Sequence, residues 1–355
     1  MKSIERPLAI AAIIGITHAT SLPAHATDIA GAGSTFVFPI LTKWADAYKK
    51  ATGVVINYQS VGSGAGIKQI KSKTVDFGAS DAPLVPKELA AYGLVQFPIV
   101  MGGVAPVVNI KGIGAGQLKL TGPVLADIFL GKITRWNDPA ITTLNPSLTL
   151  PALAIVPVYR SDGSGTTYVF TDYLAKVSPE WKDKVGVNTA VEFPKGIGGK
   201  ANEGVAAFTA STSGAIGYVE YAYAKLNNLA FVLLQNHDGA FVAPGSQSFQ
   251  SAAGHADWAS ATAFYVSLAD QPGSQSWPIS GSTFVLVYKS QSKPGIAREL
   301  LKFFDWAYHD GAKLTEGLDY VPMPQAVVQL VESAWTAIKE PDGGPAWKGV
   351  TLPQH

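Results

Sequence analysis

The sequence contains no cysteine among its 355 residues. The chain therefore forms no disulfide bond and carries no lipid attached through cysteine, although a chain without cysteine suits either redox compartment. Charged residues are also few, at 15%, and the formal net charge is +1. A nucleic-acid partner normally requires a basic patch that neutralises phosphates. The balanced charge argues against such a partner, and any anion that this chain binds must be held by local donors.

Long hydrophobic runs are absent, so no segment is expected to cross a bilayer. The apolar run 8–16 is short, follows Lys2 and Arg6, and precedes a small-residue cleavage site at 24–26. This order predicts a cleaved signal peptide over residues 1–26 and export to the periplasm. Its removal lowers Lys plus Arg from 27 to 25 and Asp plus Glu from 26 to 25, which leaves a mature net charge near zero.

Motifs of catalysis and of metal binding are missing as well. No serine is flanked by the two glycines of a nucleophile elbow. Gly31 and Gly33 lack the third glycine of a dinucleotide-binding motif, and the segment 196–200 lacks the spacing of a P-loop. The histidines after the signal peptide show no metal-ligand spacing; they are His237, His255, His309 and His355. We therefore expect no catalytic residue, no metal and no cofactor.

Glycine and proline, by contrast, are plentiful, with 36 and 23 residues, and hydrophobic residues reach 47%. This chain can build two domains or one elaborate domain. Apolar runs typical of strands alternate with helical patterns, which predicts an α/β fold with mostly parallel sheets and ligands at the carboxyl ends of the strands. We expect strands at 28–33, 54–58, 76–81, 97–101, 104–109, 154–159, 214–219 and 282–288. We expect helices that begin near 34 and 67 and helices at 125–130, 167–177, 296–309 and 327–339.

Small polar residues and glycines occupy three of the predicted strand-to-helix turns. The first N–H groups of a helix have no partner inside it, and the helix dipole makes this end electropositive, so such turns can bind anions. An ordinary capped turn is the alternative at each position, because Ser and Thr are common N-caps. If the turns converge, the candidate donors are Ser34, Thr35, the Phe36 N–H, Ser63, Gly64, Ser164, Gly165 and Thr166.

Charged side chains make the anion hypothesis more specific. Arg160 could bind a tetrahedral oxyanion through a two-pronged contact, and Asp162 could hold its guanidinium in place. Asp81 ends the predicted strand 76–81, and an ionised carboxylate there would require a proton on the anion. Phosphate carries such a proton at neutral pH and sulfate does not, so Asp81 would reject sulfate. Taken alone, Asp81 also fits a helix cap or a surface carboxylate, and Asp162 an ordinary turn residue.

Four ordered motifs, at 31–36, 61–64, 76–81 and 160–166, give the sequence a recognisable pattern. Together they closely resemble the phosphate-specific periplasmic binding proteins of the bacterial ABC phosphate importer. The resemblance runs through the mature chain; it includes Phe97-Pro98 and the segments 131–133, 214–221 and 302–307.

The resemblance implies a type II periplasmic binding protein fold, in which two α/β domains joined by a two-stranded hinge close a cleft on one phosphate. The first domain would be discontinuous, with residues 27–103 and 279–355, and the second would comprise residues 104–278. The residues themselves suggest that the apolar strands around Gly102 and Gly103 carry the chain from one domain into the other. The proline- and glycine-rich tail beyond Glu340 is expected to be a surface segment.

The resemblance also implies a role for each residue of the site. Asp81 would accept the phosphate proton, and Arg160, oriented by Asp162, would supply the positive charge. Gly64 stands where relatives often have Ser, which removes one hydroxyl donor. The other phosphate ligands would be Thr35, the Phe36 N–H, Ser63, Ser164, Gly165 and Thr166, with Ser34 beside them.

These observations favour a monomeric receptor that binds inorganic phosphate and delivers it to the permease subunits of an ABC importer in the inner membrane. A receptor for another tetrahedral oxyanion and a secreted phosphatase that uses a serine of these turns are the alternatives. Asp81 disfavours the first, and the missing general base and metal cluster disfavour the second.

Overall fold

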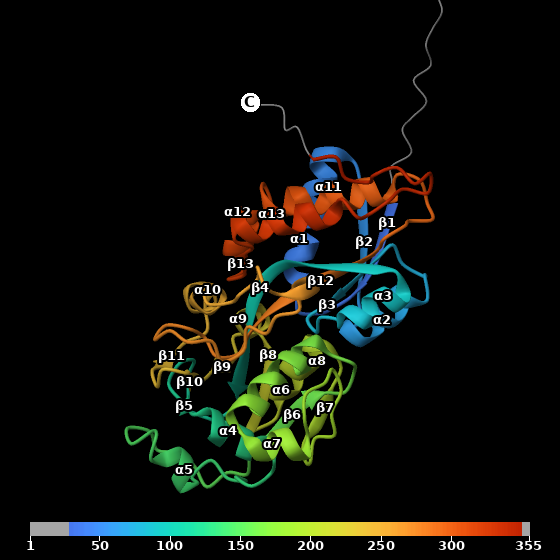
Figure 1. Ribbon diagram of the computed structural model, residues 1–355. Coiled ribbons are helices and arrows are strands. Elements are labelled where there is room, and N and C mark those ends of the chain that lie inside the picture. Colours follow the sequence, from blue (N-terminus) through green and yellow to red (C-terminus); the bar gives the residue numbers. More distant parts are fainter. Residues whose placement is uncertain (1–27, 350–355) are drawn as a thin grey trace, which may run out of the picture.

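A computed structural model describes residues 28–349. The predicted signal peptide lies outside the described residues. The described chain forms two α/β domains, and strand β4 (Leu94–Val108) runs through both of them. Figure 1 shows α11, α12 and α13 gathered with α1 at one end of the molecule, and α4, α6, α7 and α8 at the other.

Strand β4 joins the two domains because it changes its partner along its length. The part 94–103 pairs with β12 (Ser280–Tyr288), and the part 104–108 pairs with β8 (Ala215–Glu220). The strand order across the sheet is β2-β1-β3-β12-β4-β8-β6-β7. The remaining strands of this order are β1 (Asp28–Gly33), β2 (Val55–Ser60), β3 (Phe77–Ser80), β6 (Val156–Arg160) and β7 (Ile197–Gly199).

The sheet of the first domain is covered by helices on both faces. Successive side chains of a strand point to opposite faces, and the neighbours Val285 and Leu286 of β12 belong to two separate buried clusters. On one face Phe304 packs against Phe77 and Phe97, while Ile70 is buried in the cluster of the other face. The covering helices are α1 (Phe38–Thr52), α2 (Ser63–Lys71), α3 (Pro86–Tyr92), α11 (Ile296–Tyr308) and α13 (Gln325–Trp335). The C-terminal helices thus complete the N-terminal domain, as the discontinuous arrangement requires.

The core of the second domain is built on aromatic side chains. The ring of Tyr218 stacks on Phe170 with centroids 4.1 Å apart, and Phe129 meets Phe170 edge-on at 4.9 Å. Phe129 lies in α4 (Gly122–Phe129) and Phe170 in α6 (Gly165–Val177). The other helices are α5 (Pro139–Thr142), α7 (Pro179–Lys184), α8 (Ala201–Ser211), α9 (Tyr221–Leu226), α10 (Ser246–Ala253), the 3-10 helix Thr262–Phe264 and α12 (Ala312–Glu316). The short strands are β5 (Lys119–Leu120), β9 (Ala230–Phe231), β10 (Leu233–Gln235), β11 (Phe241–Val242) and β13 (Val321–Pro322).

The prediction of two separate strands on either side of Gly102 and Gly103 is wrong, because both glycines continue β4. A Cβ on Gly103 would lie 2.1 Å from the ring of Phe249, and one on Gly102 would lie 3.1 Å from Phe36. Glycine inside a strand often marks such a close approach rather than a turn. The two predicted strands 97–101 and 104–109 are therefore one strand.

The prediction of mostly parallel pairing is also wrong at the centre of the sheet. Strand β12 runs antiparallel to both β3 and β4, and β4 runs antiparallel to β8. Parallel pairs remain on both flanks, where β1 pairs with β2 and β3, and β6 pairs with β7 and β8. Hydrophobic periodicity reports which face of a strand is buried but not the direction of its neighbours.

The segment after Glu340 is not a simple surface tail within the described residues. Trp347 is 8% exposed and meets Trp335 edge-on with centroids 4.8 Å apart. The carboxylate of Glu340 accepts the N–H groups of Gly295 and Arg298 at the start of α11. The segment therefore fastens α11 and α13. The proposed domain boundaries remain a prediction.

No helix within residues 28–349 has the length and apolar character needed to traverse a lipid bilayer.

Candidate anion-binding site

The three hydroxyl-and-glycine turns meet between the two domains. The N–H of Gly64 donates to the carbonyl of Gly163 at 2.9 Å, which joins the start of α2 to the turn before α6. A Cβ on Gly165 would lie 2.3 Å from Oδ2 of Asp81 and 2.4 Å from Oγ of Ser63. Glycine is needed here because the two walls of the cleft come this close.

The N-terminus of α6 forms one wall of the cleft. Ser164 is the N-cap, and its Oγ accepts the N–H of Thr167 at 3.0 Å. The N–H of Ser164 itself donates to the carbonyl of Thr189 at 2.8 Å, so the hydroxyl is the group that Ser164 can offer to a ligand. Gly165 and Thr166 open the helix, where N–H groups have no intrahelical partner. Ser164 and Thr166 are both 0% exposed, which makes these donors a buried set.

Arg160 and Asp162 form an ion pair with two hydrogen bonds beside this helix. Nε of Arg160 donates to Oδ1 of Asp162 at 2.8 Å, and Nη2 donates to Oδ2 at 2.5 Å. Burial acts to raise the pKa of Asp162, but the hydrogen bonds and charge of Arg160 outweigh it and lower that pKa. Nη1 of Arg160 lies 3.3 Å from Oγ1 of Thr166 and so faces the cleft donors. The expected contact between Arg160 and Asp162 is therefore present.

Asp81 lies at the end of β3 on the opposite wall and is 2% exposed. Its carboxylate accepts the hydroxyls of Ser34 at 2.7 Å and Thr283 at 2.6 Å, and Oγ of Ser63 lies 3.5 Å from Oδ2. Burial raises the pKa of Asp81 to about 6, while the hydrogen bonds from Thr283 and Ser34 and the charge of Arg160 oppose the rise. Asp81 is therefore mainly ionised at neutral pH and acts as an acceptor.

Ser34 and Phe36 have a different arrangement from the one predicted. Helix α1 begins at Phe38 rather than near Ser34, because Ser34 and the residues after it form a turn that precedes the helix. The N–H of Phe36 donates to Oγ of Ser34 at 3.0 Å, and this hydroxyl in turn donates to Asp81. Ser34 thus connects Asp81 to the backbone of the turn.

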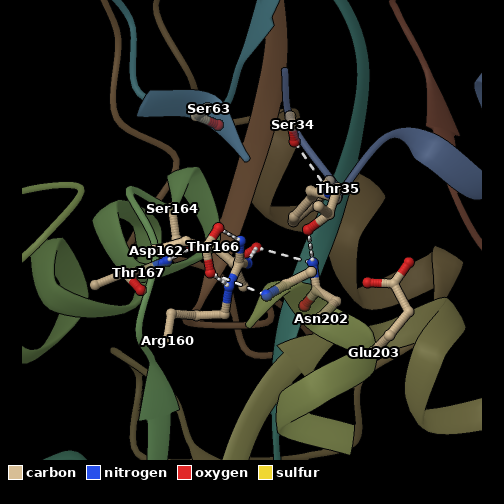
Figure 2. A network of polar contacts seen from close by, with 12 residues as sticks. Ser34, Thr35, Ser63, Arg160, Asp162, Ser164, Thr166, Thr167, Asn202 and Glu203 are labelled. Carbon is tan, nitrogen blue, oxygen red and sulfur yellow. Dashed lines mark hydrogen bonds and ion pairs between the residues drawn. The ribbon is translucent and has the colours of Figure 1, made fainter. Parts of the chain in front are cut away.

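Thr35 extends from the same turn to the other domain. Its Oγ1 accepts Nδ2 of Asn202 at 2.7 Å, and its carbonyl accepts the hydroxyl of Tyr223 at 2.8 Å. Figure 2 shows Asn202 between Thr35 and Thr166, with Arg160 beside them. The turn 34–37 is therefore attached to the second domain as well as to the first.

Asn202 and Thr283 belong to this network and were missed by the sequence analysis. Asn202 follows the glycine-rich segment 196–200, which was considered only as a P-loop. Thr283 lies inside a predicted strand, and alternation alone does not say which strand faces Asp81. The sequence marks neither residue, because their partners come from distant parts of the chain.

One group of possible metal ligands occurs among the described residues. Asp305, His309 and Glu332 place ligand atoms within 4.8 Å of one another. Nδ1 of His309 lies 2.9 Å from the backbone carbonyl of Asp305. This group joins α11 to α13 in the first domain and shares no residue with the cleft network.

Known proteins resemble this sequence over most of its length. The family model described as the PBP superfamily domain matches residues 18–310. Phosphate-binding protein PstS of Pasteurella multocida is 51% identical over 329 residues, which cover 92% of this chain and 96% of the relative. Phosphate-binding protein PstS of Haemophilus influenzae is 50% identical over 318 residues, which cover 89% and 95%.

A solved structure confirms the predicted fold class. A high-affinity periplasmic phosphate-binding protein, bound with phosphate at pH 8.5, matches with a TM-score of 0.71 at 22% identity. The match covers 92% of this chain and 100% of the other. The two-domain α/β architecture is thus that of periplasmic binding proteins.

Proposed function

Because the chain belongs to the PstS family of phosphate-binding proteins, we propose that it binds inorganic phosphate in the cleft between its two domains. It then delivers the phosphate to the permease subunits of an ABC importer in the inner membrane. We expect it to act as a monomer in the periplasm, after removal of the predicted signal peptide. Its relatives are named as binding proteins, which supports a receptor rather than an enzyme.

The observation that carries this proposal is the buried acceptor Asp81 opposite a set of buried donors. Arg160 and the N-terminus of α6 offer N–H and O–H groups to the anion, as a helix end and a guanidinium do elsewhere. We assign the phosphate ligands to Thr35, the Phe36 N–H, Ser63, Asp81, Arg160, Ser164, Gly165 and Thr166. We propose that Asp162 orients the guanidinium of Arg160. We propose that Ser34 orients the carboxylate of Asp81 by donating a hydrogen bond to it.

The carboxylate of Asp81 gives the site its selectivity. An ionised carboxylate is acceptor-only, so it is satisfied by an anion that still carries a proton. Monohydrogen and dihydrogen phosphate supply this proton, whereas sulfate would place two acceptors against each other in a buried site. If Asp81 acts as a hydrogen-bond acceptor, the site therefore binds phosphate and rejects sulfate.

Calorimetric titration of the mature protein with phosphate and with sulfate tests the proposal. We expect the wild type to bind phosphate and reject sulfate, and Asp81→Asn to relax the rejection, because an amide offers a donor where the carboxylate offers none. Asp76→Asn is the matched control, since Asp76 is also a buried aspartate beside β3 but accepts from Ala30 and Lys293. Equal binding of sulfate and phosphate by the wild type would exclude the acceptor role of Asp81.

The phosphatase alternative is tested separately by incubation with phosphate esters. Oγ of Ser164 accepts the N–H of Thr167. Among the hydrogen bonds of residues 28–349, no histidine reaches a serine hydroxyl of the cleft. We expect no turnover. Turnover that Ser164→Ala abolishes would contradict a receptor without enzymatic activity.

A further inference from the structure

Asn202 connects the two walls of the cleft from the start of α8. It is the second residue of that helix, and its side chain is 0% exposed. The hydroxyls on either side of it come from Thr35 of the first domain and Thr166 of the second (Figure 2). A buried amide in this place must satisfy its hydrogen-bonding groups within the network.

The orientation of the Asn202 amide is fixed by the backbone of Glu220. The N–H of Glu220 lies 3.0 Å from Oδ1 of Asn202. Because a backbone N–H can only donate, it requires the amide oxygen on this side and the NH₂ group on the other. Nδ2 has two hydrogens, and its two acceptors are Oγ1 of Thr35 at 2.7 Å and Oγ1 of Thr166 at 3.2 Å.

This orientation determines the direction in which the two hydroxyls can donate. Oγ1 of Thr166 accepts from Asn202 and also from Nη1 of Arg160 at 3.3 Å. A hydroxyl oxygen has two lone pairs, so both are used and its hydrogen must point elsewhere. The hydroxyl of Thr35 accepts from Asn202 in the same way and must give its hydrogen to another acceptor. An anion in the cleft supplies those acceptors.

We propose that Asn202 is a positioning residue that sets the Thr35 and Thr166 hydroxyls as donors to phosphate and links the two domains around it. The role rests on the proposed function, and Asn202 acts through the two threonines without touching the anion. The side chain of Asn202 is an amide, which does not titrate. Nδ2 therefore keeps both of its hydrogens at any pH near neutrality.

A double-mutant cycle between Asn202→Ala and Thr35→Val tests this role by calorimetry with inorganic phosphate. Asn202→Ala should weaken binding about 10- to 100-fold, the range expected when a buried hydrogen-bond partner is removed. If the two losses were independent, the phosphate affinity of the double variant would fall by the product of the two single losses. We expect its affinity to be at least about 3-fold higher than that, because Thr35→Val has already removed the Thr35 hydroxyl through which Asn202 acts. Independent, multiplicative losses would show a merely structural role and overturn the inference.

Asn202→Asp provides a second variant that keeps the size of the side chain and an oxygen for the Glu220 N–H. Its carboxylate accepts where the amide donates, so both hydroxyls turn toward it and away from the anion. We expect Asn202→Asp to weaken binding at least as much as Asn202→Ala. Wild-type affinity in a folded Asn202→Asp protein would overturn the inference.

Asn227→Ala is the matched control. Asn227 is exposed, and its Nδ2 donates to the carbonyl of Tyr223 at 2.9 Å, so its removal should leave the affinity within about 2-fold of the wild type. Failure of the proposed function looks different: the wild type would not bind phosphate, or Arg160→Ala would bind normally. Normal binding by the Asn202 variants together with impaired binding by Arg160→Ala would remove only the role of Asn202.

Discussion

Replacing Asp81 with asparagine should stabilise the ligand-free protein at neutral pH. Asp81 is 2% exposed, and burial raises its pKa from 3.8 to about 6. A carboxyl whose pKa is higher in the folded state contributes stability that is complete below its unfolded pKa and is lost as the pH rises through its folded pKa. The rise in the pKa of Asp81 corresponds to about 3 kcal/mol, at about 1.4 kcal/mol per pH unit. An asparagine carries no charge and avoids this loss.

Lost hydrogen bonds offset part of the gain. The carboxylate accepts the hydroxyls of Ser34 and Thr283, whereas an asparagine offers one oxygen to both. One weakened hydrogen bond costs about 1 kcal/mol. We therefore expect a net gain of about 1–2 kcal/mol in the free energy of unfolding at pH 7.5.

Urea unfolding in phosphate-free buffer between about pH 4 and pH 8 measures this effect. The difference in the free energy of unfolding between Asp81→Asn and the wild type should grow by about 2–3 kcal/mol between pH 4 and pH 7 and then become constant. Asp76→Asn should instead lower stability, because it removes a carboxylate paired with Lys293. A difference for Asp81→Asn that does not change with pH would refute the claim that burial of this charge destabilises the protein.

Three further predictions concern the cleft. Arg160→Ala should weaken phosphate binding by at least about 1.5–3 kcal/mol in calorimetry, because it removes hydrogen bonds from a charged donor; unchanged affinity would remove Arg160 from the site. Gly165→Ala should abolish phosphate binding in calorimetry and lower the temperature of thermal unfolding, since its Cβ would lie 2.3 Å from Oδ2 of Asp81; normal binding would contradict the close approach of the two walls at this residue. Sulfate binding by the wild type should strengthen as the pH falls through about 6, where Asp81 gains the proton that sulfate lacks; equal sulfate affinity at pH 5 and pH 8 would contradict this.

Local chemistry was predictable from the sequence. A strand, two glycines and hydroxyl residues before a helical pattern identify the turn at Arg160 to Thr166, and α6 begins at Gly165, two residues before the predicted helix 167–177. The pairing of Arg160 with Asp162 was predictable because the two residues are close in sequence. Such features depend on neighbours along the chain.

Features that depend on distant residues were not predictable in the same way. Thr283 donates to Asp81 across 202 positions of the sequence, and Asn202 reaches Thr35 across 167. The single strand β4 was read as two, because a glycine that makes room for Phe249 resembles a glycine that ends a strand. In each case the missing information was the identity of a side chain brought near by the fold.

The charged residues of the cleft show why contacts between distant residues matter for anion binding. Arg160 is paired with Asp162, Asp81 is mainly ionised at neutral pH, and burial raises the pKa of Glu220 to about 8, which keeps it mostly uncharged. An anion therefore meets no excess of positive charge from these four residues, and Coulomb attraction alone does not explain its binding. Oriented neutral donors at hydrogen-bond distance must do so, and their energy depends on direction. Ser34 and Thr283 donate to Asp81, and Asn202 donates to Thr35 and Thr166. We therefore expect these three residues to influence which anion is bound, because they fix which oxygen of the cleft donates and which accepts.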